Sequence, residues 1–273
     1  MKVGLCYRDS IHEPYIQDLI KYIDVLELMP DVTRFRETNF LMELCKQNNV
    51  DIGIHCLRSS LGSKEGFFVP AIEQYAIYNE YVNSIYYSDH AAFSHLHGKY
   101  LSSVNAIDFS NKSAQLMANN INNLSTYFST DILIENITQN NLSKNNRISE
   151  SAFFRKVMEL TNSKAKIMFD VTNAYVTALN NNIPFERYIE DFPFEDIVCL
   201  HVSGYERYGN GLLRDSHSRD LDSTILEATN YVINNSKPDM ILLERDFNVT
   251  SLGDTLRDLE KIRENSTYRK AVF

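Results

Sequence analysis

Eight short runs of apolar and β-branched residues recur along this chain, and they limit its fold more than any other feature does. Runs of this kind are typical of parallel strands that are buried on both faces. We expect strands at residues 2–7, 25–29, 51–57, 84–87, 131–137, 166–171, 196–202 and 240–244.

Helical periodicity fills the segments between these runs. Leu252, Leu256 and Leu259 share one helical face, for example. A capping-box pattern, Ser251 with Asp254 three positions later, opens that segment. Another helix is expected to begin at Ser149 or Ser151. Residues 117–128 also present one helical face, and further helices are expected at about 11–23, 35–48, 70–81, 183–190 and 221–235.

Strands and helices that alternate eight times predict an α/β fold, a single (β/α)8 TIM barrel. A doubly wound sheet is the weaker alternative, because neither G-x-G-x-x-G nor a Walker A motif is present. The 273 residues contain no Gly/Ser-rich linker, so we expect one catalytic domain over residues 1–273.

Composition excludes several classes of protein. The formal net charge of −9 argues against nucleic acid as the main partner, because phosphate contacts need clusters of Lys and Arg. No apolar run is long enough to span a membrane, and residues 1–10 lack the apolar segment of a signal peptide, so we expect a cytoplasmic protein. The four cysteines are scattered without a CxxC motif, so neither a disulfide framework nor a thiolate zinc site is expected.

Metal-ligand residue types gather at the C-terminal ends of the expected strands, where a TIM barrel performs its chemistry. Carboxylates packed there would repel one another unless protons or cations neutralised them. Imidazoles and carboxylates without thiolates suit iron, manganese or zinc. Because one ion needs fewer ligands, the set predicts two or three metals with bridging carboxylates. The expected ligands are His55, His90, Glu135, Asp170, His201, Asp215, His217 and Glu244.

Other polar residues receive different interpretations. Asp246 and Asp89 are expected to orient the metal ligands. Glu27 ends the second strand, and a place beside the ligands or in a salt bridge fits it equally well. Cys56 neighbours His55, so strand alternation turns it away from the barrel mouth. The histidines expected at the surface are His12, His95 and His97.

In order and spacing, these motifs resemble the DUF692 family of multinuclear non-heme iron-dependent oxidative enzymes, which are TIM barrels. The motifs are Gly53-Ile54-His55, Ser60-Leu61-Gly62-Ser63, Ser88-Asp89-His90, Ile134-Glu135-Asn136, Phe169-Asp170-Val171-Thr172-Asn173, Leu200-His201-Val202-Ser203-Gly204, Asp215-Ser216-His217 and Leu243-Glu244-Arg245-Asp246. Tyr205 and Thr172 stand where the family more often has His and Asn, which affects only ligands from those two positions. The short chain and the sequence around His201 look most like the MbnB-type oxidases of methanobactin biosynthesis.

The resemblance implies a cluster of two to three non-heme iron ions held by the eight residues above, with Asn173 as a further ligand. It implies that dioxygen is the co-substrate. The implied substrate is a ribosomally made, Cys-containing precursor peptide (MbnA-like), presented with an MbnC-like partner protein. A four-electron oxidation of its cysteines would give an oxazolone with an adjacent thioamide. Asp246 or a bridging hydroxide is a candidate general base.

Two alternatives remain open at this point. A hydrolase or isomerase of the xylose isomerase-like type would also place His, Glu and Asp around two or three ions, without a need for dioxygen. A non-catalytic metal store is the third hypothesis. Four arginines lie near the ligands in sequence: Arg58, Arg207, Arg214 and Arg245. They would bind acidic peptide groups or carboxylates of the cluster, or else form salt bridges with other neighbouring acids.

Overall fold

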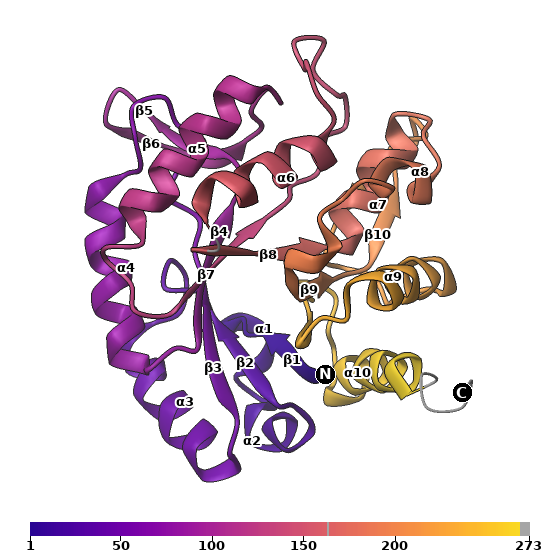
Figure 1. Cartoon of the computed structure of the whole chain (residues 1–273). Helices are drawn as coiled ribbons and strands as arrows, with labels where there is room; N and C mark the ends of the chain where they lie inside the picture. The colour runs from indigo at the N-terminus through magenta and orange to yellow at the C-terminus, as the bar shows by residue number, and fades with distance from the viewer. Residues whose placement is uncertain (163, 268–273) are drawn as a thin grey trace.

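The computed structural model describes residues 1–162 and 164–267, and its centre is a closed barrel of eight parallel strands (Figure 1). The barrel order is β1-β12-β9-β8-β7-β4-β3-β2. This arrangement confirms the predicted TIM barrel. Residues 163 and 268–273 of the expected domain lie outside the described residues. The strands are β1 (Lys2–Cys6), β2 (Val25–Leu28), β3 (Asp51–His55), β4 (Tyr86–His90), β7 (Asp131–Glu135), β8 (Ala165–Asp170), β9 (Ile197–Val202) and β12 (Met240–Leu243).

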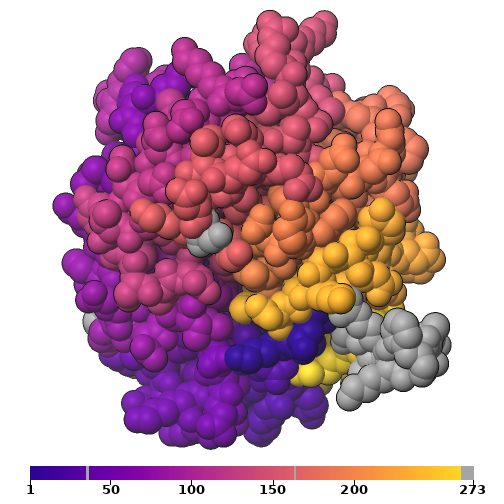
Figure 2. All heavy atoms as spheres, viewed as in Figure 1, coloured from indigo at the N-terminus to yellow at the C-terminus, as the bar shows by residue number. Residues whose placement is uncertain are grey.

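Helices surround the barrel, and Figure 2 shows that side chains fill the spaces between the ribbons on the face in view. Ser149 accepts a hydrogen bond from the Ala152 amide, which caps α6, and Ser110 forms a capping box on α5. The longer helices are α3 (Phe35–Asn48), α4 (Val69–Val82), α5 (Asn111–Leu124), α6 (Glu150–Thr161), α7 (Val171–Asn180), α9 (Ser223–Ser236) and α10 (Leu252–Thr267); α8 (Phe185–Ile189) is short. Among the described residues, no helix is long and apolar enough to cross a membrane.

Several elements differ from the sequence-based expectation. The helix expected at about 11–23 is broken into α1 (Asp9–His12), α2 (Ile16–Leu19) and the 3-10 turn η1 (Ile20–Tyr22). Pro14 lies at the first break, where it cannot donate the backbone hydrogen bond that a continuous helix needs. Helix α7 was not expected, because its first residues read as a continuation of the preceding strand.

Two hairpins in the loops after barrel strands were also not expected. Strands β5 (Phe93–Leu96) and β6 (Lys99–Asn105) pair in the loop that follows β4, and β10 (Tyr205–Arg207) pairs with β11 (Leu213–Asp215) in the loop after β9. Both hairpins therefore extend the side of the barrel on which the strands end. The second one carries Asp215 as its last residue.

The apolar core has an outer layer between strands and helices and an inner layer that fills the barrel. Cys56 packs in the outer layer, as its strand position predicted. The inner layer consists of Cys6, Val25, Tyr86, Leu133, Met168, Cys199 and Leu242. Residues at the strand ends therefore rest on a filled interior rather than on an open channel.

The expectation that three histidines lie at the surface is wrong for two of them. His12 is fully buried, because its Nδ1 turns back to accept a hydrogen bond of 2.9 Å from the Arg8 amide. His95 is buried in the first hairpin, with its ring 5.2 Å from that of Phe68. His97 is exposed, as expected.

Candidate metal centre

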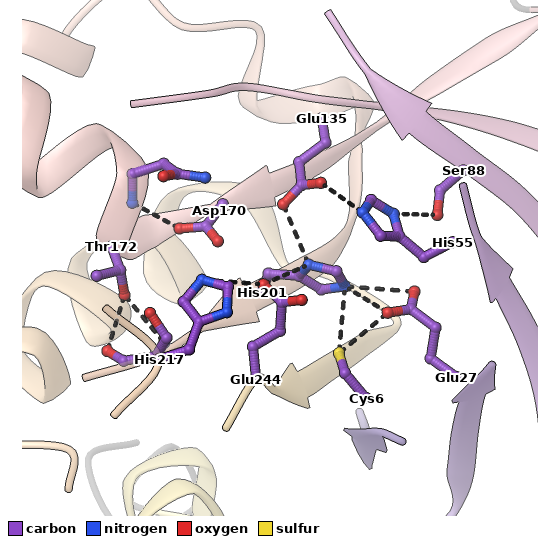
Figure 3. A network of polar contacts seen from close by, with 12 residues as sticks. Cys6, Glu27, His55, Ser88, Glu135, Asp170, Thr172, His201, His217 and Glu244 are labelled. Atoms are coloured by element: carbon purple, nitrogen blue, oxygen red, sulfur yellow. Dashed lines mark hydrogen bonds and ion pairs between the residues drawn. The ribbon is translucent and has the colours of Figure 1, made fainter. Parts of the chain in front are cut away.

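Strand register brings five of the expected ligands into one layer at the barrel mouth, and Figure 3 shows His55, Glu135, Asp170 and His201 among them. His90 and Glu135 are direct partners across β4 and β7, and Asp170 and His201 are partners across β8 and β9. His55 ends β3. Neighbouring parallel strands end at the same rim, so ligands far apart in the sequence lie within reach of one another.

Glu135 lies at the centre of this layer and is buried. Its Oε2 is 3.3 Å from Nε2 of His55 and 3.2 Å from Nε2 of His90. Its other oxygen, Oε1, is 3.1 Å from Nδ1 of His201. One carboxylate therefore faces two different sets of imidazole nitrogens through its two oxygens.

Glu244 continues the layer toward the loop after β9. Its Oε2 lies 3.4 Å from Nδ1 of His201 and 3.6 Å from Nε2 of His217. The same His217 nitrogen is 2.7 Å from Oδ2 of Asp215. His217 has a φ of 50°, a left-handed conformation that a residue with a Cβ rarely adopts and that often marks a functional position.

Asp170 combines a structural contact with an unused oxygen. As the N-cap of α7, its Oδ1 accepts a hydrogen bond of 2.6 Å from the Asn173 amide. The side chain of Asn136 fixes this turn, because it accepts from the Asp170 amide at 2.8 Å and donates to the Asp170 carbonyl at 2.9 Å. The start of α7 thus holds Asp170 beside Glu135, His201 and Glu244.

Neighbouring groups orient the imidazoles. The Ser88 hydroxyl donates to the Ile54 carbonyl and lies 3.0 Å from Nδ1 of His55, so that nitrogen carries the proton and Nε2 presents a lone pair to Glu135. Asp246 lies 3.0 Å from Nδ1 of His217, in agreement with its expected orienting position. A carboxylate or hydroxyl behind the ring is the usual support of a metal-binding histidine.

Burial and the neighbouring acids set the protonation of the layer. Burial lowers the pKa of His55, which leaves a neutral imidazole. Burial also disfavours the charged form of His201, but Glu27 and other nearby acids outweigh it and raise the pKa of His201 well above its ordinary value. Burial and the Asp215 carboxylate raise the pKa of Asp170. Protons therefore occupy positions for which a metal ion would compete.

Two atoms provide a direct test of whether these residues fit metal ions. Among the described residues, Glu135 Oε2 and Asp170 Oδ2 are buried side-chain oxygens without a hydrogen-bond partner. Leaving such an atom unpaired is costly unless a cation or proton meets it. Together with three converging imidazoles, the oxygen and nitrogen donors fit iron, manganese or zinc.

A cavity of about 670 Å³ opens above the layer. His55, His90, Glu135 and Glu244 form part of its lining, so a substrate in the cavity would reach the ligand layer directly. The other lining residues include Arg8, Val32, Arg34, Asn173, Asp215, His217, Asp246 and Phe247.

The last two expected site residues lie at the rim. The Asn173 amide group donates to the Asn136 carbonyl at 3.2 Å, and its Oδ1 accepts from the Thr138 hydroxyl. Asp246 lies between His217 and the Arg8 guanidinium, whose Nε is 2.8 Å from Asp246 Oδ1. A ligand role for Asn173 and a base role for Asp246 stay predictions.

Two of the four arginines that lie near the ligands in sequence form salt bridges with neighbouring acids, in agreement with one of the two interpretations. Arg58 pairs with Asp31, and Arg245 is buried against Asp258 and Asp220. Arg207 binds the Gly211 carbonyl, and Arg214 binds the Tyr208 hydroxyl. These four arginines are absent from the cavity lining, whereas Arg8 and Arg34 belong to it.

Sequence reasoning missed Arg8, Cys6 and Tyr86 and left Glu27 undecided. Arg8 follows the end of β1, and its Nη2 lies 3.1 Å from Glu244 Oε1. Cys6 and Glu27 end or nearly end β1 and β2, and both side chains point into the barrel. Their strand-end positions were a usable signal, because the same argument identified the other site residues.

The fold and this layer define a TIM barrel with a buried candidate metal centre at its mouth. The family model described as "RiPP precursor modification enzyme MbnB/TglH/ChrH" matches residues 2–267, and the chain belongs to this family.

Curated relatives match over most of their length. A UPF0276 protein of Shewanella loihica is 24% identical over 271 residues, covering 97% of this chain and 95% of that protein. A UPF0276 protein of Pseudomonas aeruginosa is 27% identical over 275 residues, covering 96% and 91%.

Solved structures show the same fold at low identity. A xylose isomerase domain containing protein from Salmonella typhimurium aligns with a TM-score of 0.64 at 13% identity, covering 97% of this chain and 96% of that one. D-psicose 3-epimerase in the presence of D-fructose aligns with a TM-score of 0.61 at 13% identity, covering 100% and 99%. These likenesses concern the fold alone.

Proposed function

We propose that this chain is an iron- and dioxygen-dependent oxidase that modifies cysteines of a ribosomally made precursor peptide. It would act in the cytoplasm together with an MbnC-like partner protein, as MbnB-type enzymes of methanobactin biosynthesis do. The family, which modifies RiPP precursors, supports the peptide substrate. The observation that carries the metal chemistry is the position of Glu135, which faces His55 and His90 with one oxygen and His201 with the other.

This geometry supports a multinuclear centre. His55, His90 and Glu135 would hold one ion, and Asp170, His201 and Glu244 would hold another. Asp215, His217 and Glu244 would hold a third. Asn173 would be a further ligand at the rim.

When bound, iron supplies one-electron redox chemistry with dioxygen and a position for a soft thiolate ligand. The chain's own residues would hold the ions between the filled barrel interior on one side and the cavity on the other. Arg8 offsets part of the acid excess, because its guanidinium contacts both Glu244 and Asp246. Asp246 keeps the His217 ring in place and is the candidate base for a proton at the cavity wall.

The reaction balances without a further reductant. Conversion of a cysteine and its neighbouring amide to an oxazolone with an adjacent thioamide removes four hydrogen atoms from the peptide. The four electrons and four protons reduce one dioxygen to two waters. The cavity of about 670 Å³ is large enough to admit a cysteine with its flanking residues.

Metal analysis combined with peptide mass spectrometry tests the proposal. The chain is loaded with iron anaerobically and mixed with the Cys-containing peptide and partner protein encoded beside its gene. Loss of four hydrogen atoms that requires both iron and air supports the oxidase. A zinc-loaded chain with full activity would contradict it, and O2-independent turnover of a ketose with zinc or manganese would support the isomerase alternative instead.

A further inference from the structure

A second polar layer adjoins the candidate metal centre inside the barrel, and Figure 3 shows two of its residues, Cys6 and Glu27, beside His201. It consists of Cys6 on β1, Glu27 on β2 and Tyr86 at the start of β4, all fully or almost fully buried. The hydrophobic residues packed around it inside the barrel include Val25, Leu133, Met168, Cys199 and Leu242. A buried carboxylate is costly in such surroundings unless specific partners hold it.

His201 connects this layer to the candidate metal centre. Its Nε2 lies 3.2 Å from Oε1 and 3.3 Å from Oε2 of Glu27, while its Nδ1 faces Glu135 at 3.1 Å. Glu27 would therefore keep the proton on Nε2 when an ion replaces the proton on Nδ1, the nitrogen that is directed toward the ion positions. This is the arrangement in which a carboxylate fixes both the tautomer and the orientation of a metal-binding histidine.

Glu27 itself is fully hydrogen-bonded. The Tyr86 hydroxyl donates to its Oε2 at 2.7 Å, and the Cys6 thiol donates to its Oε1 at 3.0 Å. Glu135 and Asp170, by contrast, each keep one buried oxygen that has no hydrogen-bond partner within the described part of the chain. This difference separates a carboxylate that supports a ligand from carboxylates that face an ion.

Gly53 makes the support of Glu27 possible. It is the register partner of Glu27 across β2 and β3, and a Cβ at this position would overlap the Tyr86 ring. The absent side chain leaves the space through which Tyr86 reaches across β3 to Glu27. The glycine of the 51–55 strand is thus required for space rather than for a special backbone conformation.

We propose that Glu27 is the positioning residue of His201, held in turn by Tyr86 and Cys6, and that it keeps Nδ1 of His201 directed at the metal centre. This inference rests on the proposed metal centre. Without the Glu27 carboxylate, the ring of His201 would lose its fixed tautomer, and the ion that it binds would be held about 10- to 100-fold less tightly. Cys6 is a hydrogen-bond donor in this account and not a metal ligand.

The test compares Glu27→Gln with Glu150→Gln in the full chain. Glu150 is a matched control, because it is also buried and also accepts a tyrosine hydroxyl, from Tyr188, but it lies on α6 with no histidine partner. Each protein is loaded with ⁵⁷Fe(II) anaerobically. Bound iron per chain, the rate of iron loss to a chelator and the Mössbauer spectrum are then measured.

We expect Glu27→Gln to release one iron subsite about 10- to 100-fold faster and to change the quadrupole splitting of that subsite, while Glu150→Gln matches the wild type. Equal release rates and spectra for the two variants would overturn the inference. A wild-type chain that binds no iron would instead reject the proposed metal centre, so the two failures are distinguishable.

Two further variants keep the test decisive. If Glu27→Gln does not fold, Tyr86→Phe takes its place. This variant retains the ring beside Gly53 and removes only the hydroxyl that holds Glu27, so it should change the same iron subsite by a smaller factor. Cys6→Ala should keep the wild-type number of bound irons. Loss of an ion from Cys6→Ala would show that Cys6 is a ligand and would overturn the positioning account.

Discussion

His55 Nε2 lies 3.3 Å from Glu135 Oε2, and that oxygen has no hydrogen bond to any described residue. Because Ser88 holds the proton-bearing nitrogen of His55, two lone pairs face each other across this gap. A cation near this oxygen relieves the repulsion, and His90 Nε2 approaches the same oxygen at 3.2 Å. A metal ion held by these groups should therefore add to the stability of the fold.

Metal ions should accordingly raise the thermal stability of the chain. At a free Fe(II) concentration of about 100 times its Kd, one bound ion adds about 2.7 kcal/mol, which corresponds to a rise in Tm of several degrees. Anaerobic thermal denaturation with Fe(II) and with a chelator measures the difference. Glu135→Gln should lose most of the rise and Glu150→Gln should keep it; an identical Tm with and without metal would contradict the site.

Replacing His217 with Ala should weaken iron binding while the barrel still folds. The side chain of His217 is 21% exposed, and the residue follows a hairpin that lies outside the barrel. Its replacement therefore removes little packing. Iron analysis should show at least about tenfold weaker retention of one ion, with unchanged circular dichroism. Unchanged iron content and unchanged peptide turnover would remove His217 from the site.

Glu150 provides a pH prediction that is independent of the metal centre. Burial raises the pKa of Glu150 from 4.5 to about 7, so the folded state binds the proton more tightly than the unfolded state does. The neutral carboxyl therefore stabilises the fold below pH 4.5, and this contribution is lost as the pH rises to 7. The free energy of unfolding of Glu150→Gln, relative to that of the wild type, should therefore rise by on the order of 3 kcal/mol between pH 4 and pH 8.

Urea unfolding at several pH values measures this effect. Tyr188→Phe is a useful companion variant, because it removes the hydroxyl that donates to Glu150. The free energy of unfolding of Tyr188→Phe should fall most steeply with pH, since the charged Glu150 then lacks its donor. If the wild type and Glu150→Gln differ in free energy of unfolding by the same amount from pH 4 to pH 8, then the pKa of Glu150 is not raised and the prediction is wrong.

The space at Gly53 predicts a non-additive pair of substitutions. Gly53→Ala should destabilise the fold by about 1–3 kcal/mol, because the new methyl group overlaps the Tyr86 ring. In a Tyr86→Ala background the same substitution should cost much less, because the ring is gone. Urea unfolding of the four proteins measures the coupling, and additive costs would show that the two residues do not compete for this space.

The sequence was sufficient to predict the barrel and to place most residues of the candidate site, for a physical reason. Parallel strands buried on both faces need near-continuous apolar runs, and their last residues share one rim, so His55, Glu135, Asp170 and His201 could be located by position alone. The end of the fourth strand was less clear, since its polar last residues resemble a loop and β4 continues to His90.

The missed features depend on contacts between distant segments. Tyr86 reaches Glu27 only because Gly53 lies between their strands in the closed barrel, and no local pattern encodes that contact. His12 reads as a surface residue until its ring turns back to the Arg8 amide. Arg8 became part of the site because β1 and β12 are neighbours, which places it beside Glu244.

The central claim is that iron in this barrel oxidises a cysteine-containing peptide with dioxygen, and one measurement tests it most directly. The peptide and partner protein encoded beside the gene are incubated in air with the iron-loaded chain, and the peptide mass is determined. The account predicts the loss of four hydrogen atoms with the wild-type and Glu150→Gln chains, and no change with Glu135→Gln or without air. An unmodified peptide with the iron-loaded wild-type chain, or full modification without dioxygen, would contradict it.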